Sequence, residues 1–201
     1  KIYIDMVGDL LFVKDLPGFN VEEIKFEGEI RKINYTTKNV KHRDGHVDFI
    51  ATIKDFINDN DRTDLVLKHI TKLRKEGKSV YIFADLKAYS DHIYFKCVNL
   101  GKKVILRGGA CAEDYEDASD ADLIFTTYKF GEKCLSIGHM DGIVYLTPRR
   151  NAGQSSGRIV RRDGDPLSAR VIVDIVDSCF SRQFIVRKKT YNERGFTIII
   201  S

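Results

Sequence analysis

Residues 154–161, which read QSSGRIVR, hold the side chains with the clearest chemical potential in this chain. Arg158 and Arg161 are three positions apart, so their side chains share one face if the segment is helical. Guanidinium groups are permanently charged, forked donors that match the geometry of phosphate oxygens. Gly157 precedes the first arginine and allows another surface to approach closely. The pattern is typical either of a clamp on a polyphosphate supplied by another domain or of two solvated surface charges.

Residues 77–79, which read GKS, resemble the end of a phosphate-binding loop of the form G-x-x-x-x-G-K-[ST]. The first glycine of such a loop would fall at position 72, where the chain has Lys72. The loop also needs a strand before it and a helix after it, whereas the apolar pattern here predicts the reverse order. We therefore interpret Gly77 as a helix terminator, and a chain of this kind would provide only half of an ATP site.

The size and charge of the chain limit the kinds of protein to which it can belong. With 201 residues, of which 43% are hydrophobic and 31% charged, it can form one well-packed globular domain with a small extra segment. A net charge of +4 permits contact with nucleic acid without requiring it. No apolar run reaches the roughly 20 residues that span a bilayer, and we see no signal peptide, so we expect no membrane partner. Because the first residue is Lys1, we expect a fragment or a processed product.

Cysteine and histidine spacing argues against a metal site. The four cysteines (Cys97, Cys111, Cys134 and Cys179) form no C-x-x-C pair, and the five histidines are scattered. Cys134 and Cys179 lie in apolar surroundings, which predicts buried free thiols. Free thiols favour a reducing, intracellular compartment over secretion.

The apolar pattern predicts an α/β fold. Residues 80–84, VYIFA, form a continuous apolar run of the kind found in a strand covered on both faces. Further strands are expected at residues 24–35 (with a bulge at Gly28), 104–106, 123–125, 142–146, 171–176 and 196–200. Helices are expected at residues 47–57, 63–76, 91–100, 129–135, 151–162 and 179–192, and a polar, basic loop at 38–45. Short buried strands that alternate with helices indicate a mostly parallel sheet flanked by helices.

Ligands of such sheets meet the loops at the carboxyl ends of the strands. Those loops are residues 85–87, 107–109, 126–128 and 147–150, and they carry hydroxyls, glycines and cations. The combination suits phosphate groups, although polar loops are common at this edge in any α/β domain. Arg149 and Arg150 fit a solvated pair equally well, and Tyr128 fits a packed aromatic residue at a helix start.

The ordered set of segments resembles a known family. The strings VYIFAD, VILRGG, ADLIFTTYKFGEKCLSI and DGIVYLTPRRNAGQSSGRIVR look like motifs IV, IVa, V and VI of the second RecA-like domain of superfamily 2 helicases. The nearest likeness is to the phage and large-DNA-virus branch, which includes relatives of the poxvirus transcript-release helicase. The resemblance implies a mostly parallel RecA-like sheet. It also implies that residues 41–201 form the second RecA-like domain and that residues 1–40 are a linker and strand segment after an absent first RecA-like domain.

The resemblance assigns roles to particular residues. Arg158 and Arg161 would be catalytic, reaching the γ-phosphate of ATP, with Gln154, Gly157 and Ser136 as further nucleotide-site positions. Contacts to the nucleic-acid backbone would come from Lys87, Arg107, Gly108, Thr126, Thr127 and Tyr128. Motif V departs from the family, because Cys134 and Ser136 occupy its usual glycine and aspartate positions. The aspartate couples the nucleotide to the strand, so coupling here is expected to be weaker or differently arranged.

The resulting functional hypothesis is the C-terminal motor domain of an ATP-dependent DNA or RNA helicase or translocase. ATP and Mg²⁺ would be bound mainly by the absent first domain, so the 201 residues alone should be inactive. The expected partners are that upstream domain and nucleic acid, with DNA favoured over RNA; a viral protein would act in the host cytoplasm or the virion. The alternative is a nucleic-acid-binding or docking module whose ATPase coupling has decayed. A small-molecule enzyme such as a nucleotide-sugar transferase is disfavoured, because no catalytic histidine or carboxylate pair lies at the strand ends.

Overall fold

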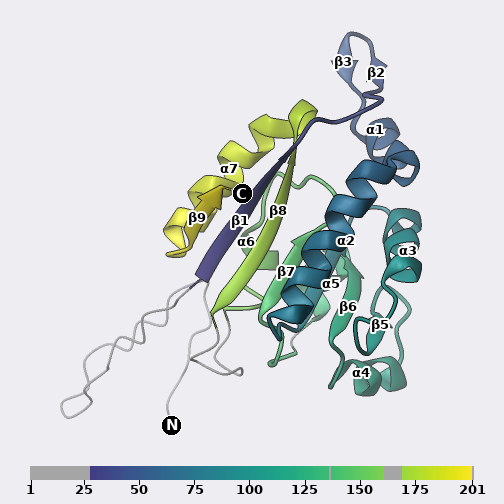
Figure 1. Ribbon diagram of the computed structural model, residues 1–201, viewed down its shortest axis with the longest axis vertical. Helices are drawn as coiled ribbons and strands as arrows, with labels where there is room; N and C mark the ends of the chain where they lie inside the picture. Colours follow the sequence, from purple (N-terminus) through teal and green to yellow (C-terminus); the bar gives the residue numbers. More distant parts are fainter. Residues whose placement is uncertain (1–27, 136, 161–168, 201) are drawn as a thin grey trace, which may run out of the picture.

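A seven-stranded parallel sheet organises the protein in the computed structural model, which describes residues 28–135, 137–160 and 169–200. The strand order is β5-β6-β4-β7-β8-β1-β9 (Figure 1). The strands are β1 (Gly28–Tyr35), β4 (Val80–Ala84), β5 (Lys103–Ile105), β6 (Leu123–Thr127), β7 (Gly142–Tyr145), β8 (Arg170–Asp177) and β9 (Thr197–Ile200). Every strand pair in this sheet is parallel, which confirms the predicted α/β fold.

Seven α-helices are present among the described residues. They are α1 (Phe49–Asp55), α2 (Asn60–Lys75), α3 (Lys87–Lys96), α4 (Ala112–Ala118), α5 (Tyr128–Cys134), α6 (Gly153–Ser156) and α7 (Ser181–Glu193). Short 3-10 turns, η1 (Phe56–Asn58) and η2 (Ser178–Phe180), follow α1 and precede α7. A small antiparallel hairpin, β2 (His42–Arg43) with β3 (His46–Val47), stands apart from the main sheet (Figure 1).

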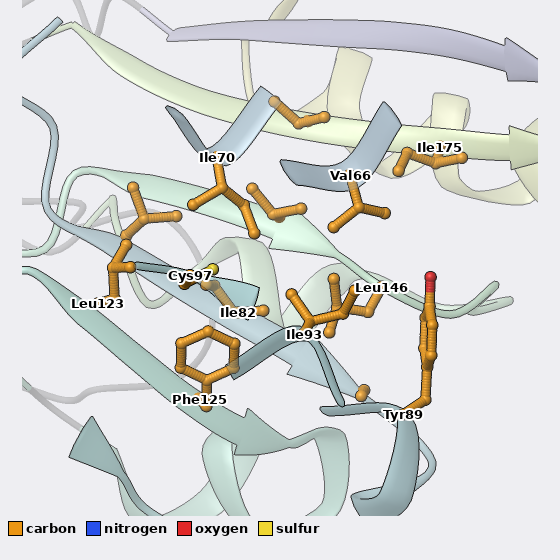
Figure 2. Close-up of a cluster of buried hydrophobic side chains, with 14 of the residues drawn as sticks. Val66, Ile70, Ile82, Tyr89, Ile93, Cys97, Leu123, Phe125, Leu146 and Ile175 are labelled. Atoms are coloured by element: carbon orange, nitrogen blue, oxygen red, sulfur yellow. The ribbon is translucent and has the colours of Figure 1, made fainter. Parts of the chain in front are cut away.

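The sheet separates two apolar cores. Because side chains alternate along a strand, Ile82 of β4 faces one core and Phe83 faces the other. Figure 2 shows the first core, in which Val66 and Ile70 of α2 pack with Ile82 and other strand residues. The second core includes residues of α5 and α7, among them Tyr128 and Tyr191. All five residues of β4 are buried, as the continuous apolar run predicted.

Gly77 ends α2, as its sequence context predicted. Its φ of +77° lies in the left-handed region that glycine adopts without strain. The N–H groups of Gly77 and Lys78 donate to the carbonyls of Arg74 and Leu73, which satisfies the open end of the helix. The strand β4 follows directly. The GKS string is therefore part of a helix-to-strand turn.

Several predicted boundaries were wrong. Helix α3 begins at Lys87 rather than at residue 91, and the segment around 151–162 contains only the four-residue helix α6 within the described part. Helix α4 was missed because its sequence, AEDYEDA, has one buried residue and therefore no apolar stripe. The predicted basic loop at 38–45 contains β2, which forms a hairpin with β3 at residues 46–47, and α1 begins only at Phe49. All four cysteines are free, but Cys97 is the buried one, whereas Cys134 is exposed and Cys179 half-buried.

Strand β1 lies inside the sheet. It pairs along its whole length with β8 and along four residues with β9, so that Ile30 is opposite both Ile172 and Ile198. Ile30 and Ile33 are buried. Residues 28–35, part of the expected linker and strand segment, are thus hydrogen-bonded on both sides to strands from the end of the chain.

Candidate nucleotide and nucleic-acid interface

The candidate site lies along the carboxyl edge of the sheet. Because all seven strands are parallel, the segments that follow β4, β5, β6, β7 and β8 meet at this edge. Lys87 is exposed at the start of α3, after β4. Arg107, after β5, is half-buried and donates from Nη1 to Asp91 Oδ1 at 2.9 Å. Gly108 is exposed, and a Cβ at this position would meet no atom within 4 Å.

The predicted trio at the start of motif V is mostly internal. Thr126 is 2% exposed and Tyr128 is 1% exposed, whereas Thr127 is half-buried. The Thr127 hydroxyl accepts the N–H of Phe130 at 3.4 Å and so begins α5. The Tyr128 hydroxyl donates to the Thr147 carbonyl at 2.7 Å. Among these three, only Thr127 offers side-chain surface to a ligand.

Tyr128 is the packed aromatic residue that the sequence left open as an alternative. Its ring stacks on Phe83 with centroids 5.5 Å apart. Burial raises the pKa of its hydroxyl well above the usual value, so this group stays protonated and keeps donating to Thr147. Direct contact between this side chain and nucleic acid is therefore incompatible with the structure.

Arg149 joins three loops of the site. Its Nη2 donates to Glu132 Oε2 of α5 at 2.8 Å, and its Nη1 lies 3.7 Å from Asp85 Oδ1 after β4. Its guanidinium also lies 4.7 Å from the centre of the Tyr128 ring. Burial raises the pKa of both carboxyls, and Arg149 opposes each shift because it favours the charged form. Arg149 and Arg150 are consequently different, since Arg150 is exposed and outside this cluster.

The QxxGR segment forms a tight turn after β7. Gln154 is exposed on α6, and Ser155 and Ser156 are buried, with both hydroxyls donating to the Ala152 carbonyl at 3.2 Å and 2.7 Å. Helix α6 ends at Ser156, so Arg158 lies beyond it. The predicted sharing of one helical face therefore does not apply at Arg158. Arg161 and Ser136 lie outside the described residues.

Gly157 lies against the side chain of Arg194. A Cβ at Gly157 would be 2.8 Å from Arg194 Nη1, and the C-terminal end of α7 thereby reaches α6. The sequence predicted such a close approach at this glycine, and the structure confirms it. The approaching surface is a part of the same domain.

Arg158 is half-buried and bound to the end of α5. Its Nη1 donates to the Leu135 carbonyl at 2.7 Å, and its Nη2 donates to the Glu132 carbonyl. The last carbonyls of a helix have no partner within the helix, and a cation near them is favoured. A guanidinium here thus links the segment after α6 directly to the end of α5. The same Glu132 accepts from Arg149 through its carboxylate, so α5 is held at one residue by both arginines.

Two buried ion pairs support the edge, and the sequence analysis missed both. Arg187 of α7 donates from Nε and Nη2 to Asp174 of β8 at 2.7 Å and 2.8 Å, and Arg62 of α2 is paired in the same forked way with Asp177. Burial of these four side chains is almost complete. Asp174 and Asp177 interrupt the apolar run of β8, and a carboxylate in such a run needs an internal partner. That interruption was the available signal.

Other kinds of site receive no support from the described residues. Across residues 28–135, 137–160 and 169–200, no group of three or more His, Cys, Asp or Glu side chains could hold a metal ion. Within the same residues, no helix has the length and apolarity needed to cross a bilayer.

The chain is similar in sequence to viral proteins that are named as helicases. The chain is 29% identical, over an alignment 208 positions long, to "Putative ATP-dependent RNA helicase QP509L" of African swine fever virus, with the same values for the Kenya and Malawi isolates. The alignment covers 86% of this chain and 39% of the viral protein, so the chain spans about two fifths of these relatives. No protein-family model matches the chain.

Comparison of structures identifies which part of a helicase has this fold. T4 UvsW superposes with a TM-score of 0.66 at 14% identity, over 86% of this chain and 41% of UvsW. The C-terminal domain of the DEAD-box protein Dbp5 superposes with a TM-score of 0.57 at 12% identity, over 87% of this chain and 91% of that domain. The chain resembles the C-terminal RecA-like domain of superfamily 2 helicases. In this domain, α6 and Arg158 follow β7, Thr127 is the last residue of β6, and α5 follows it.

Proposed function

We propose that the chain is the C-terminal motor domain of an ATP-dependent superfamily 2 helicase or translocase. The similarity to QP509L and the fold shared with the Dbp5 C-terminal domain support this proposal. The observation that carries it is the position of Arg158, which lies just beyond α6 at the carboxyl edge of the sheet, in a Q-x-x-G-R-x-x-R string. A half-buried guanidinium at this place suits a ligand shared between two domains.

In this proposal the chain supplies cations to a nucleotide held elsewhere. ATP with Mg²⁺ would be bound by an upstream RecA-like domain, and the chemistry is attack by water on the γ-phosphate. Arg158 and Arg161 would neutralise charge on the phosphate oxygens, a role worth roughly 10³ to 10⁵ in rate where arginine fingers have been measured. Gln154, Gly157 and Ser136 would support the same site. Since these residues do not include the lysine loop, the 201 residues alone should not hydrolyse ATP.

Nucleic acid would lie along the carboxyl edge. Lys87 and Arg107 can bind phosphates through their side chains, Thr127 through its hydroxyl, and Gly108 through an unobstructed backbone N–H. Thr126 and Tyr128 would contribute backbone groups only, because their side chains are buried. We favour DNA as the substrate, whereas the viral relatives are named RNA helicases, so both must be tested. A viral source would place the activity in the host cytoplasm or the virion.

A nucleic-acid-binding module without ATPase coupling is the second candidate. One observation favours it: both terminal nitrogens of Arg158 are bound to carbonyls of α5. A guanidinium that stays there cannot also reach a phosphate. For the motor, ATP must draw Arg158 away from Glu132 and Leu135, and this exchange would couple the nucleotide to α5 without the missing aspartate of motif V.

The two candidates differ in the full-length protein. For the motor, Arg158→Ala should lower the ATPase kcat by about 10³-fold or more and leave single-strand binding within a factor of two, while Arg158→Lys should be nearly as impaired because lysine lacks the forked geometry. Lys188→Gln, an exposed change on α7, is the matched control. An Arg158→Ala protein with unchanged ATPase activity would contradict the motor, and a wild type that binds nucleic acid with no ATPase activity would favour the module.

A further inference from the structure

A surface pocket of about 310 Å³ lies between the loop after β7 and the start of α7. It is lined by Arg150, Arg182, Gln183 and Val186. Arg150 belongs to the loop after β7, and the other three lie in the first turns of α7, which follows β8 through η2 (Figure 1). Because β7 and β8 are neighbours in the sheet, the pocket is at the same carboxyl edge as the candidate site.

The pocket carries two positive charges that no carboxylate among the described residues neutralises. Arg150 and Arg182 are exposed, and neither has an ion-pair partner among the described residues. The contrast with Arg149 and Arg187 is clear, since each of those has a carboxylate partner. The first turn of α7 contains no acidic residue. Two unpaired guanidiniums in one concave site favour an anion with several oxygens.

Gln183 adds a neutral polar group to the same pocket. Its side-chain oxygen is buried and has no hydrogen-bond partner. The oxygen and nitrogen of an amide exchange places by a simple flip, so this side chain can present an N–H to a bound oxygen. Val186 supplies an apolar wall. The lining therefore combines two guanidiniums, one amide that can donate and one hydrocarbon side chain, and it contains no carboxylate that would repel an anion.

The two backbone segments that carry Arg150 and Arg182 are tied together by Arg187. Arg187, one turn beyond Arg182 and Gln183 on α7, donates from Nη1 to the backbone carbonyl of Arg149. Arg187 is itself held by Asp174, and the Tyr191 hydroxyl donates to the same carboxylate at 2.8 Å. The loop that carries Arg150 is thus tied to the helix that carries Arg182 through a buried pair. A site whose backbone segments are held together before the ligand arrives loses less entropy on binding than one whose segments move independently.

We infer that Arg150 and Arg182 bind a phosphate of single-stranded nucleic acid. The position of the pocket favours this ligand, because exposed or half-buried cations follow four strands in this half of the sheet, with β6 lying between the first two: Arg107 after β5, Lys87 after β4, Arg150 after β7 and Arg182 after β8. Adjacent strands are about 4.8 Å apart, so the row extends over roughly 19 Å, the length of several nucleotides. The inference rests on the proposed function, and it extends the path to the β8 side of the sheet.

The decisive measurement is the salt dependence of oligonucleotide binding. Labelled 20-nucleotide single strands of DNA and of RNA are titrated with the 201-residue chain between 50 and 200 mM NaCl and followed by fluorescence anisotropy. Each phosphate contact contributes about 0.7 to the slope of log K against log salt for single strands. Arg150→Gln with Arg182→Gln should lower the slope by about 0.7, because the two arginines share one phosphate, and either single change should lower it by no more than that. The control is Lys72→Gln, which removes an exposed charge near the C-terminal end of α2, just before β4 begins. This change should leave the slope unchanged.

The outcomes separate the inference from the proposed function. If the wild type and the double variant bind single strands with the same slope, the inference about Arg150 and Arg182 is wrong. The proposed role in nucleic-acid binding is then unaffected. A wild type that binds no single strand at any salt overturns both. Inorganic tripolyphosphate, titrated in parallel by calorimetry, tests the other source of phosphate. If the double variant loses tripolyphosphate binding and keeps its oligonucleotide slope, the pocket serves a nucleotide and the inference is wrong.

Discussion

Arg158 Nη1 lies 2.7 Å from the carbonyl oxygen of Leu135, so the arginine that follows α6 closes the end of α5. A second donor of the same guanidinium reaches the Glu132 carbonyl. The arginine expected at the nucleotide is therefore a structural part of α5 in this arrangement. Any movement of Arg158 toward a phosphate exposes two carbonyls, and the stability of α5 depends on where this side chain is.

Removal of Arg158 should therefore destabilise the isolated chain even without nucleotide. We expect Arg158→Ala to lower the free energy of unfolding by about 1 to 3 kcal/mol, because two partly buried carbonyls lose charged donors. Urea denaturation followed by circular dichroism measures the change. Lys133→Ala, an exposed charge on α5, should shift the midpoint much less. Equal midpoints for wild type and Arg158→Ala would show that the two hydrogen bonds do not persist in solution.

The Arg187–Asp174 pair should be essential for folding. Arg187→Met leaves Asp174 buried without its counter-charge, and breaking such a pair typically costs about 3 to 5 kcal/mol. The double change Arg187→Met with Asp174→Leu should recover a large part of that loss, because no charge then remains buried. Lys188→Met, next to Arg187 but exposed, is the control. Thermal unfolding of the four proteins would contradict the assignment if Arg187→Met and Lys188→Met melted together.

Stability should fall in mildly acidic solution because of His69. Burial lowers the pKa of this imidazole, and Lys68, Lys72 and Arg31 lower it further. The unfolded chain then binds a proton more readily than the folded chain below the ordinary pKa of about 6.5, so stability is full above that pH and declines as the pH falls from it. Each unit by which folding lowers the pKa corresponds to a loss of about 1.4 kcal/mol in the free energy of unfolding at low pH.

The His69→Gln variant isolates this contribution, because glutamine does not titrate. Urea midpoints of the variant and the wild type are compared at pH 8.0, 7.0, 6.0 and 5.5. The difference between the two proteins should narrow as the pH falls, whatever the variant loses at pH 8.0. A constant difference across the series would show that His69 titrates alike in both states.

Lys87 should contribute one phosphate contact to nucleic-acid binding. Its side chain is exposed at the start of α3 and has no ion-pair partner among the described residues. Lys87→Gln should lower the slope of log K against log salt by about 0.7 for single strands and weaken DNA and RNA alike, because phosphates carry no sequence information. Lys96→Gln, exposed at the other end of α3, should behave as wild type. A loss confined to one base sequence would argue for base contacts instead.

The architecture was readable from the sequence where a pattern is local. The run at residues 80–84 predicted a fully buried strand, and Gly77 predicted the end of the preceding helix, because each depends only on neighbouring residues. Gly157 predicted a close approach, although not that Arg194 would be the approaching group. Helix α4 was missed, since its acidic sequence covers the sheet with one buried residue and gives no periodic signal.

The site was harder to predict because its partners are distant in sequence. Arg158 binds carbonyls of residues more than 20 positions earlier, and no side-chain pattern marks a carbonyl acceptor. The residues around Tyr128 in the sequence do not distinguish a surface tyrosine from a buried one. In the fold its ring stacks on Phe83 and its hydroxyl donates to the Thr147 carbonyl, and both partners are distant in sequence. The two arginines after β7 look equivalent as a string. Only the fold distinguishes Arg149, which is paired, from Arg150, which lines a pocket.

The place of β1 between β8 and β9 has a consequence for synthesis on the ribosome. Its hydrogen-bonding partners, β8 and β9, are translated long after it, so the nascent segment must wait with both backbone edges unpaired and with Ile30 and Ile33 uncovered. Pairing between segments that are distant in sequence is slow, and strand edges left open in the meantime are prone to aggregation. Premature termination before β8 would therefore leave a polypeptide with an orphaned strand, a natural substrate for chaperones and proteases.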